Sequence, residues 1–184
     1  TLLLCFFMLT STFLTPEPIK VNTPSSVSEV KVPENDVLNI LVSPEGNIYV
    51  GSENKNTMLE MMQTVTDKFG VSITGEKLKH FREDAMIGAP MAVFESYYAL
   101  DQEKMGEEIQ KLSIPLDSID GGKSEFQEWV TAAREANPDI RIAIKSDAKT
   151  SYAVIKKMMS ELQDMNENRY QLITNLDTKK QAEI

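Results

Sequence analysis

The chain has 184 residues, of which 41% are hydrophobic and 26% are charged, values typical of a globular protein that exclude wholesale disorder. Its 19 basic and 28 acidic side chains give a net charge of −9, which argues against nucleic-acid binding, since such proteins present a basic face. One cysteine, Cys5, excludes an internal disulfide and a multi-thiolate metal site. One histidine, His80, lies in a charged stretch, where we expect a solvated imidazole. We therefore expect no cofactor or metal, and an enzyme is the less favoured class.

Residues 1–15 carry no charged side chain, and the first charge is that of Glu17. A spanning helix needs about 20 mostly apolar residues. Because the chain begins at Thr1 rather than Met, we predict a transmembrane helix whose N-terminal part is missing and which ends at Pro16. A secretory signal is the alternative, but no basic region or Ala-x-Ala-like site is visible. A lipoprotein signal is disfavoured because Leu4, rather than a small residue, precedes Cys5.

Hydroxyl side chains gather at the C-terminal end of this apolar run, at Thr10, Ser11, Thr12 and Thr15. In the simpler interpretation, they bond back to carbonyls of the preceding helical turn. Alternatively, they face another subunit or a hydrated path, because small and hydroxylated residues favour helix contacts in membranes. The sequence by itself favours the simpler interpretation.

Residues 16–36 form a proline-rich stretch, which favours an extended linker over a packed helix. Within this stretch a short segment alternates in the manner of a strand and ends at a proline: Ile19, Lys20, Val21, Asn22 and Pro24. An extended segment of this kind can add to the edge of a sheet. The simpler interpretation is a tether.

A tighter pattern follows over residues 37–176. Strands are predicted at 37–42, 48–50, 140–145 and 169–174, and helices at 126–136 and 152–165. Ser124 and Gln127 form a capping box at the start of the first of these helices. The element order ββαβαβ predicts a two-layer α+β domain with the helices on one face of a small sheet. Residues 177–184 form a polar tail.

A stretch of different character, residues 53–123, lies between the second strand and the first helix of this domain. Four helical stripes of apolar residues run through it, and we interpret it as a helical insertion. The second stripe extends to Ala85, and the third includes Tyr98 and Leu100. The first stripe is rich in methionine and includes Met58, Met61 and Met62. Such a stripe is usually core packing, while a soft partner-binding face is the less common alternative.

Three segments of the sequence are similar to segments of one known protein family. The run at 2–8 is similar to a Leu/Ile/Phe-Met membrane helix, and 19–24 is similar to a Val-Asn/Asp-Leu-Pro segment, with Thr23 where leucine is usual. Residues 142–149, with Tyr152 and the helix after it, are similar to a strand, a basic-x-Asp-Lys turn, a tyrosine and a helix. Together they resemble the ExbD/TolR family, the single-pass subunits of proton-driven motors in Gram-negative inner membranes. The linker favours ExbD, and the insertion departs from the family's shorter pattern.

The resemblance implies a single-pass protein of the inner membrane with its C-terminal domain in the periplasm. It implies an ExbD-like homodimer, an ExbB-like pentamer around the transmembrane helix, and a TonB-like energy transducer that drives outer-membrane uptake. TolR, with TolQ and TolA, serves envelope constriction instead. The family's proton-carrying aspartate would lie about two residues before Thr1, outside this sequence. Thr10 and Ser11 remain as candidates for the proton path, and Ile19, Lys20, Val21, Asn22 and Pro24 as candidates for partner binding.

Asp147 and Tyr152 also belong to the resembling segments. Aspartate in a Ser-Asp-Ala-Lys turn is most simply a turn former or helix cap, and Tyr152 a core or dimer-contact aromatic. The competing function is a membrane-tethered periplasmic scaffold or binding module whose contact surface is the insertion. A motor needs an ionisable group in its membrane helix, whereas a tether does not. A secreted hydrolase would need a catalytic cluster, and the sequence shows none.

Overall fold

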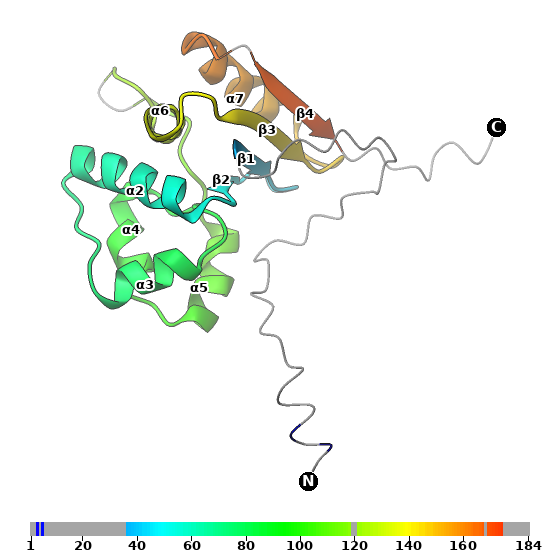
Figure 1. The fold of residues 1–184 in the computed structure, drawn as a ribbon. Coiled ribbons are helices and arrows are strands. Elements are labelled where there is room, and N and C mark those ends of the chain that lie inside the picture. Colours follow the sequence, from blue (N-terminus) through cyan, green and yellow to red (C-terminus); the bar gives the residue numbers. More distant parts are fainter. Residues whose placement is uncertain (1–2, 4, 6–35, 119–120, 168, 175–184) are drawn as a thin grey trace.

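A computed structural model describes residues 3, 5, 36–118, 121–167 and 169–174 (Figure 1). The predicted tail, and nearly all of the predicted membrane helix and linker, lie outside these residues. The core elements are β1 (Val37–Val42), β2 (Ile48–Ser52), α6 (Glu125–Ala136), β3 (Arg141–Ser146), α7 (Tyr152–Asp164) and β4 (Tyr170–Thr174). The predicted ββαβαβ order is confirmed.

The four strands form one mixed sheet in the order β2-β1-β3-β4. β1 and β2 pair as an antiparallel hairpin, while β1, β3 and β4 run parallel. Gly46 makes the hairpin turn with a φ of 90°, a left-handed conformation that a residue without Cβ adopts at little cost. In the register, Ile40 lies opposite Val50 on one side and Ile144 on the other.

Helices α6 and α7 lie on the same side of the sheet (Figure 1). α7 belongs to the crossover between the neighbouring parallel strands β3 and β4, whereas α6 lies in the connection from β2 to β3, which are not neighbours. Hydrogen bonds from Ser124 and Gln127 at the start of α6 to Glu161 of α7 hold the two helices together. Side chains at alternate positions of β1 and β3 point to a common face, and those of one set are at most 2% exposed: Leu38, Ile40, Val42, Ile142, Ile144 and Ser146. This apolar face is the centre of the core.

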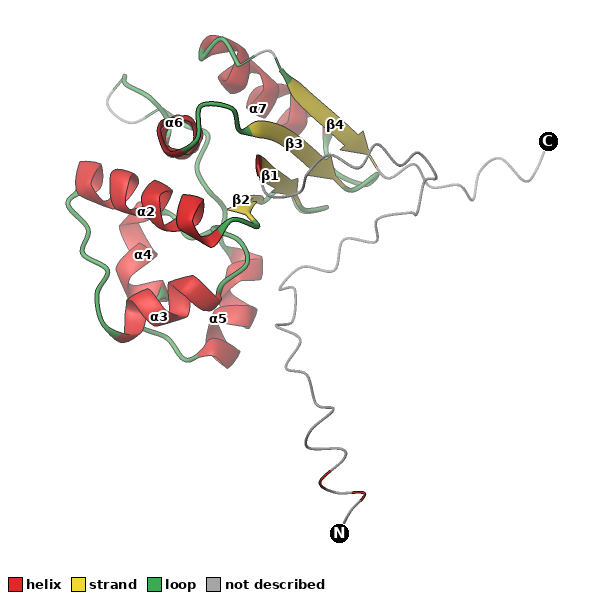
Figure 2. Ribbon diagram, viewed as in Figure 1, coloured by secondary structure: helices red, strands yellow, loops and turns green. Residues whose placement is uncertain are grey.

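The insertion folds as α2 (Lys55–Phe69), α3 (Glu76–Glu83), α4 (Met91–Tyr97), α5 (Gln102–Glu108) and the 3-10 helix η2 (Ile109–Lys111), as Figure 2 shows. α6 and α7 cover one face of the sheet, as predicted, and the insertion in addition encloses Tyr49 of β2. This side chain points to the face opposite the Ile40 face, it is fully buried, and its hydroxyl donates a hydrogen bond to the Ile109 carbonyl at 3.0 Å.

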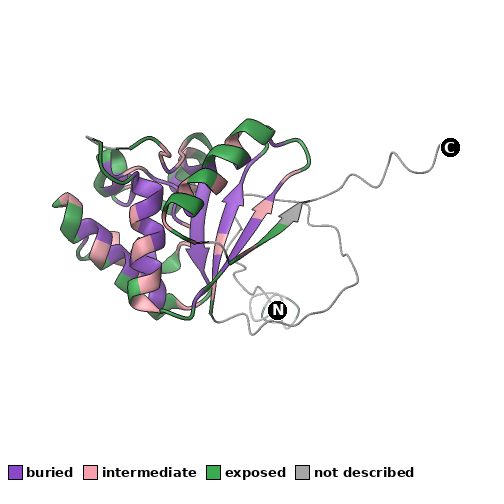
Figure 3. Ribbon diagram, turned by 90° about the horizontal axis from the view of Figure 1, so that it is seen from above, coloured by how far each residue is buried: buried purple, intermediate pink, exposed green. Residues whose placement is uncertain are grey.

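Local sequence signals account for the ends of these helices. Ser124 and Gln127 make both hydrogen bonds of the predicted capping box of α6. Gly70, with a φ of 67°, ends α2 as the C-cap. The methionine stripe of α2 is core packing, as predicted, with all three methionines at most 3% exposed. Buried residues fill β2 and most of β1 and β3, while exposed residues lie on the outer face of α7 (Figure 3).

Some predicted helical stripes are longer than the helices that form. Ala85 follows the end of α3, and Tyr98 and Leu100 follow the end of α4. Tyr98 is nevertheless fully buried, and it packs edge-on against Phe81 and Phe94 at centroid distances of 5.4 and 4.9 Å. The apolar pattern therefore identified the core residues correctly, although the chain leaves the helix to bring some of them there.

Candidate functional site

Asp147 and Tyr152 lie in the connection that follows β3. The Asp147 carboxylate accepts a hydrogen bond from the Lys149 N–H at 2.9 Å, and its carbonyl accepts one from the Thr150 N–H at 3.0 Å. Thr150 in turn donates its hydroxyl to the Ser43 carbonyl at the end of β1. Tyr152 begins α7 and is 75% exposed, so the expectation of a core aromatic is wrong. Its ring is available to a partner.

The two outer edges of the sheet differ. On the β2 side, Val50 and Ile87 exchange backbone hydrogen bonds of 2.8 and 2.7 Å, and the Ile114 N–H donates to the Ile48 carbonyl at 3.0 Å. The insertion thus occupies this edge. Within the described residues no strand pairs with the outer side of β4, where Leu172 is 44% exposed. An extended segment that adds to this part of the sheet would therefore have to bind along β4.

A polar groove of about 630 Å³ runs between α6 and α7. Arg134 of α6 makes a two-pronged ion pair with Glu167, with contacts of 2.8 and 2.6 Å, and its guanidinium also donates to the carbonyls of Pro138 and Ile140. The Ser124 hydroxyl donates to the Glu161 carboxylate at 2.8 Å. The Ser124–Glu161 hydrogen bond joins α6 to α7, and the Arg134–Glu167 ion pair joins α6 to the segment after α7.

One carboxyl group connects the insertion to α6, and a second lies within the insertion. Glu125 of α6 is 6% exposed, and its carboxylate accepts a hydrogen bond from the Met91 N–H at the start of α4. Burial raises the pKa of Glu125, and the hydrogen bond from Met91 lowers it by less. Asp84, after α3, accepts hydrogen bonds from the Tyr98 hydroxyl and the Ala85 N–H. Burial raises the pKa of Asp84 to about 6, against the lowering effect of these donors.

Sequence reasoning missed both carboxylates. Glu125 follows the capping serine directly, and an acidic residue in the first turn of a helix is ordinarily a solvated partner of the helix dipole. Asp84 follows Glu83 at the end of a short charged helix, where nothing indicates burial. His80, expected to be solvated, is half-buried, with its Nδ1 at 3.1 Å from the Tyr98 carbonyl.

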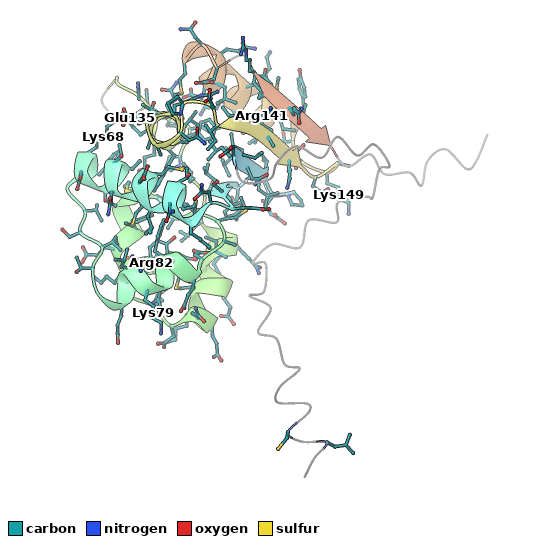
Figure 4. The ribbon with its side chains drawn as sticks, viewed as in Figure 1. Lys68, Lys79, Arg82, Glu135, Arg141 and Lys149 are labelled. Carbon is teal, nitrogen blue, oxygen red and sulfur yellow. The ribbon has the colours of Figure 1, made fainter. Side chains whose placement is uncertain are left out.

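Figure 4 labels several basic side chains of the described surface: Lys68 on α2, Lys79 and Arg82 on α3, Arg141 on β3, and Lys149 in the connection after β3. Within the part of the chain that the structure describes, no group of three or more His, Cys, Asp or Glu side chains could hold a metal ion. Among the same residues, none of the helices combines the length and the apolar character needed to cross a membrane.

A family model described as biopolymer transport protein ExbD/TolR matches residues 1–177, which is nearly the whole chain. The chain belongs to the ExbD/TolR family. The resemblance drawn from the residues is confirmed, and the match includes both the apolar N-terminal run and the insertion. No curated protein and no solved structure matches the chain.

Members of the ExbD/TolR family are inner-membrane subunits with a periplasmic domain, and they act in biopolymer transport with ExbB-like and TonB-like partners. The proton-path candidates Thr10 and Ser11 lie outside the described residues. So do the partner-binding candidates Ile19, Lys20, Val21, Asn22 and Pro24. Of the residues that the sequence singled out for function, the structure therefore describes only Asp147 and Tyr152.

Proposed function

We propose that this chain is an ExbD-type subunit of an inner-membrane motor that uses the proton motive force to energise TonB-dependent transport through the outer membrane. The observation that carries the proposal is the continuous family match over residues 1–177. A TolR-type subunit of an envelope-constriction motor is the alternative within the same family. The linker segment at 19–24 favours the ExbD type.

In this proposal, residues 1–15 belong to a transmembrane helix inside an ExbB-like pentamer, paired with a second copy of the chain. A carboxylate in such a helix is costly unless it faces protein or water, and burial brings its pKa towards neutrality. A proton that crosses the membrane releases about 2.3 kcal/mol per 100 mV, so alternating protonation can bias one helix orientation over another. Thr10 and Ser11 would lie along that path.

The linker segment at 19–24 is proposed to bind as an added strand, either within the dimer or with the TonB-like partner. Among the described residues no strand pairs with the outer side of β4, which supports this proposal, because the insertion leaves no room for an added strand beside Val50 of β2. Backbone hydrogen bonds would supply the affinity, and alternate side chains the specificity.

The proposal is tested in a Gram-negative host that lacks its own ExbB-, ExbD-, TolQ- and TolR-type proteins. The full-length gene is supplied with its ExbB-like partner, and TonB-dependent uptake and detergent resistance are measured with and without a protonophore. Restored uptake that the protonophore abolishes is the expected result. Restored detergent resistance without uptake would favour the TolR-type motor. If neither returns while the proteins assemble in the membrane, a tethered scaffold is the better interpretation.

Two sets of variants test the parts of the proposal separately. Val21→Pro removes a backbone donor in the proposed added strand, so it should weaken capture of the partner, whereas Val30→Pro, also in the linker but outside the segment, should not. Thr10→Val keeps the side-chain volume closely and Ser11→Val enlarges it, and both remove the hydroxyl. Unchanged uptake in both valine variants would exclude these hydroxyls from the proton path.

A further inference from the structure

The part of the chain from β3 to β4, residues 141–174, differs in charge from the rest of the protein. It contains six basic and four acidic side chains, whereas the whole chain contains 19 basic and 28 acidic ones. Seven ion pairs join described residues, and of the basic residues in this part only Lys157 takes part in one. The other five basic side chains make no ion pair with a described residue: Arg141, Lys145, Lys149, Lys156 and Arg169.

Two of these basic side chains lie on the face of the sheet opposite α6 and α7. Side chains alternate along a strand, and buried Ile144 points to the helices, so Arg141 and Lys145 point away from them. In the register, Gln171 of β4 lies opposite Ala143, midway between the two basic positions, and it is exposed. A strand added outside β4 would lie about 10 Å from β3, which is two strand spacings. A long basic side chain can therefore meet a carboxylate of that strand across Gln171.

The other face of the β4 edge is bordered by one flank of α7. The opposite flank of α7 faces α6, because Glu161 accepts a hydrogen bond from Ser124. Tyr152 and Lys156, one helical turn apart, lie on the flank away from α6, and the strand order places β4 on that side. Leu172 of β4 is paired with a residue of the helix-covered face and is 44% exposed, so it points to the same side. This flank and Leu172 form a partly apolar border along β4.

Of the two outer edges of the sheet, only β2 is bonded along its length by the insertion. The N–H and the carbonyl of Val50 are both bonded to Ile87. The N–H of Ile48 donates to the Ser113 hydroxyl at 2.9 Å, and its carbonyl accepts from the Ile114 N–H. Within the described residues no strand pairs with the outer side of β4. The edge that is open to an added strand is thus the one surrounded by basic side chains.

We propose that the outer edge of β4 binds an acidic extended segment of a partner protein, which adds to the sheet as a strand. Apolar side chains at every second position of this segment pack against Leu172 and the exposed ring of Tyr152. Carboxylates at the positions between them meet Arg141 and Lys145 on the other face. Backbone pairing supplies affinity, while the charges select the partner and speed its encounter.

Charge complementarity decides between the possible occupants of this edge. The linker segment at 19–24 can pair through its backbone, but it carries Lys20 and no carboxylate. A second copy that pairs through its own β4 brings a second Lys156 and a second Arg169 to the same place. An anionic lipid surface meets one face of a sheet edge at a time, whereas the basic side chains border both faces. An acidic strand offsets the charge on both faces, so it is the preferred occupant.

This inference rests on the proposed function only in treating β4 as an edge that receives a strand, and the two fail in different experiments. Restored uptake without peptide binding would leave the motor standing and refute the acidic partner. Peptide binding without restored uptake would leave the binding edge standing and refute the motor.

Peptide binding to the purified full-length protein tests the proposal. The probe is a fluorescently labelled peptide of about ten residues in which valine and glutamate alternate, and binding is followed by anisotropy. One comparison peptide has lysine in place of glutamate, and another has the same composition with valine and glutamate in separate blocks. A third has the sequence of the linker segment at 19–24. We expect the alternating acidic peptide to bind, with an affinity that falls in high salt, and each comparison peptide to bind at least about tenfold more weakly.

Variants that remove charge locate the binding site. Arg141→Gln combined with Lys145→Gln should weaken binding by about tenfold, because one exposed ion pair contributes up to about a factor of five. The matched control is Lys79→Gln combined with Arg82→Gln, which removes two exposed charges from α3 (Figure 4). The control should keep the affinity of wild type within about twofold, since its charges are screened from β4.

Hydrogen exchange shows where the peptide lies. Successive amides of a strand point to opposite edges, so one of the Gln171 and Leu172 amides faces outward and should gain protection when the peptide binds. The Val50 amide of β2 should not change. Protection gained at β2 instead of β4, equal binding of the lysine or the block peptide, or an equal loss in the control variant would overturn the proposal. Tighter binding of the linker peptide would assign the edge to the linker and refute the acidic partner. Binding to phosphatidylglycerol vesicles through Arg141 and Lys145, without binding of the acidic peptide, would refute it in favour of a lipid surface.

Discussion

Substitution of Gly88 tests whether the insertion and the sheet form one cooperative unit. A Cβ at this position would overlap Cδ1 of Tyr49, and it would lie 2.6 Å from Cε1 of the same ring and 3.0 Å from the Ile109 side chain. The ring cannot easily retreat, because Tyr49 is fully buried and its hydroxyl is bonded to the Ile109 carbonyl. Gly88→Ala therefore forces the insertion away from β2 or distorts the ring.

Overpacking of a core costs about 1–3 kcal/mol, and loss of the tyrosine hydrogen bond adds about 1 kcal/mol. We expect Gly88→Ala to lower the free energy of unfolding by about 2–4 kcal/mol, a large share of the stability of a domain of this size. Gly106 of α5 is the matched control, since its Cβ would meet nothing within 4 Å. Gly106→Ala should stabilise the protein by up to about 1 kcal/mol through helix propensity.

The assay is urea denaturation followed by circular dichroism and by the fluorescence of Trp129, the single tryptophan, which is fully buried in α6. Both signals should share one midpoint, and in Gly88→Ala they should move together. The reasoning fails if Gly88→Ala unfolds within about 0.5 kcal/mol of wild type. It also fails if the two signals separate, because the insertion would then unfold as an independent unit.

Three further substitutions probe the contacts of α6. Glu167→Ala leaves the half-buried Arg134 without its carboxylate, and denaturation should reveal a loss of about 1–3 kcal/mol that is smaller in high salt. Ser124→Ala removes the N-cap acceptor and should cost about 1 kcal/mol, with the m-value unchanged. Burial raises the pKa of Glu125. The contribution of Glu125 to the free energy of unfolding is therefore present at low pH and is lost as the pH rises. In melting curves between pH 4 and pH 8, Glu125→Gln should show a smaller decline in stability than wild type. An equal decline in the two proteins would contradict this reasoning.

Much of the fold follows from local patterns. Alternating apolar residues predicted β3, and the capping box predicted the start of α6, because both signals act within a few residues of chain. Spacing along α2 and the glycine after it predicted both the buried methionines and the helix end. Where the chain leaves a helix while its apolar pattern continues, as at Tyr98, local reasoning placed the residue in the core but in the wrong element.

The candidate site was less accessible to such reasoning. Asp147 forms a turn through hydrogen bonds to residues two and three positions away, which a sequence pattern can indicate. The burial of Asp84 depends on Tyr98, fourteen positions along the chain, and that of Glu125 on Met91, thirty-four positions earlier. No local signal reports such distant contacts. The exposure of the Tyr152 ring likewise depends on how the chain folds and not on the neighbouring sequence.

The sequence by itself determined the family, the order of the elements and most of the core, because hydrophobic periodicity, turn residues and caps are encoded over short distances. Only the tertiary structure decided that the insertion covers the outer edge of β2 and leaves that of β4 uncovered within the described residues. Only the tertiary structure brought the half-buried Asp84 carboxyl to the Tyr98 hydroxyl and buried Glu125 beside Met91. Both results depend on which surfaces meet after the chain has folded. These contacts decide which strand edge is covered and how far a carboxyl group is desolvated, and desolvation shifts its pKa.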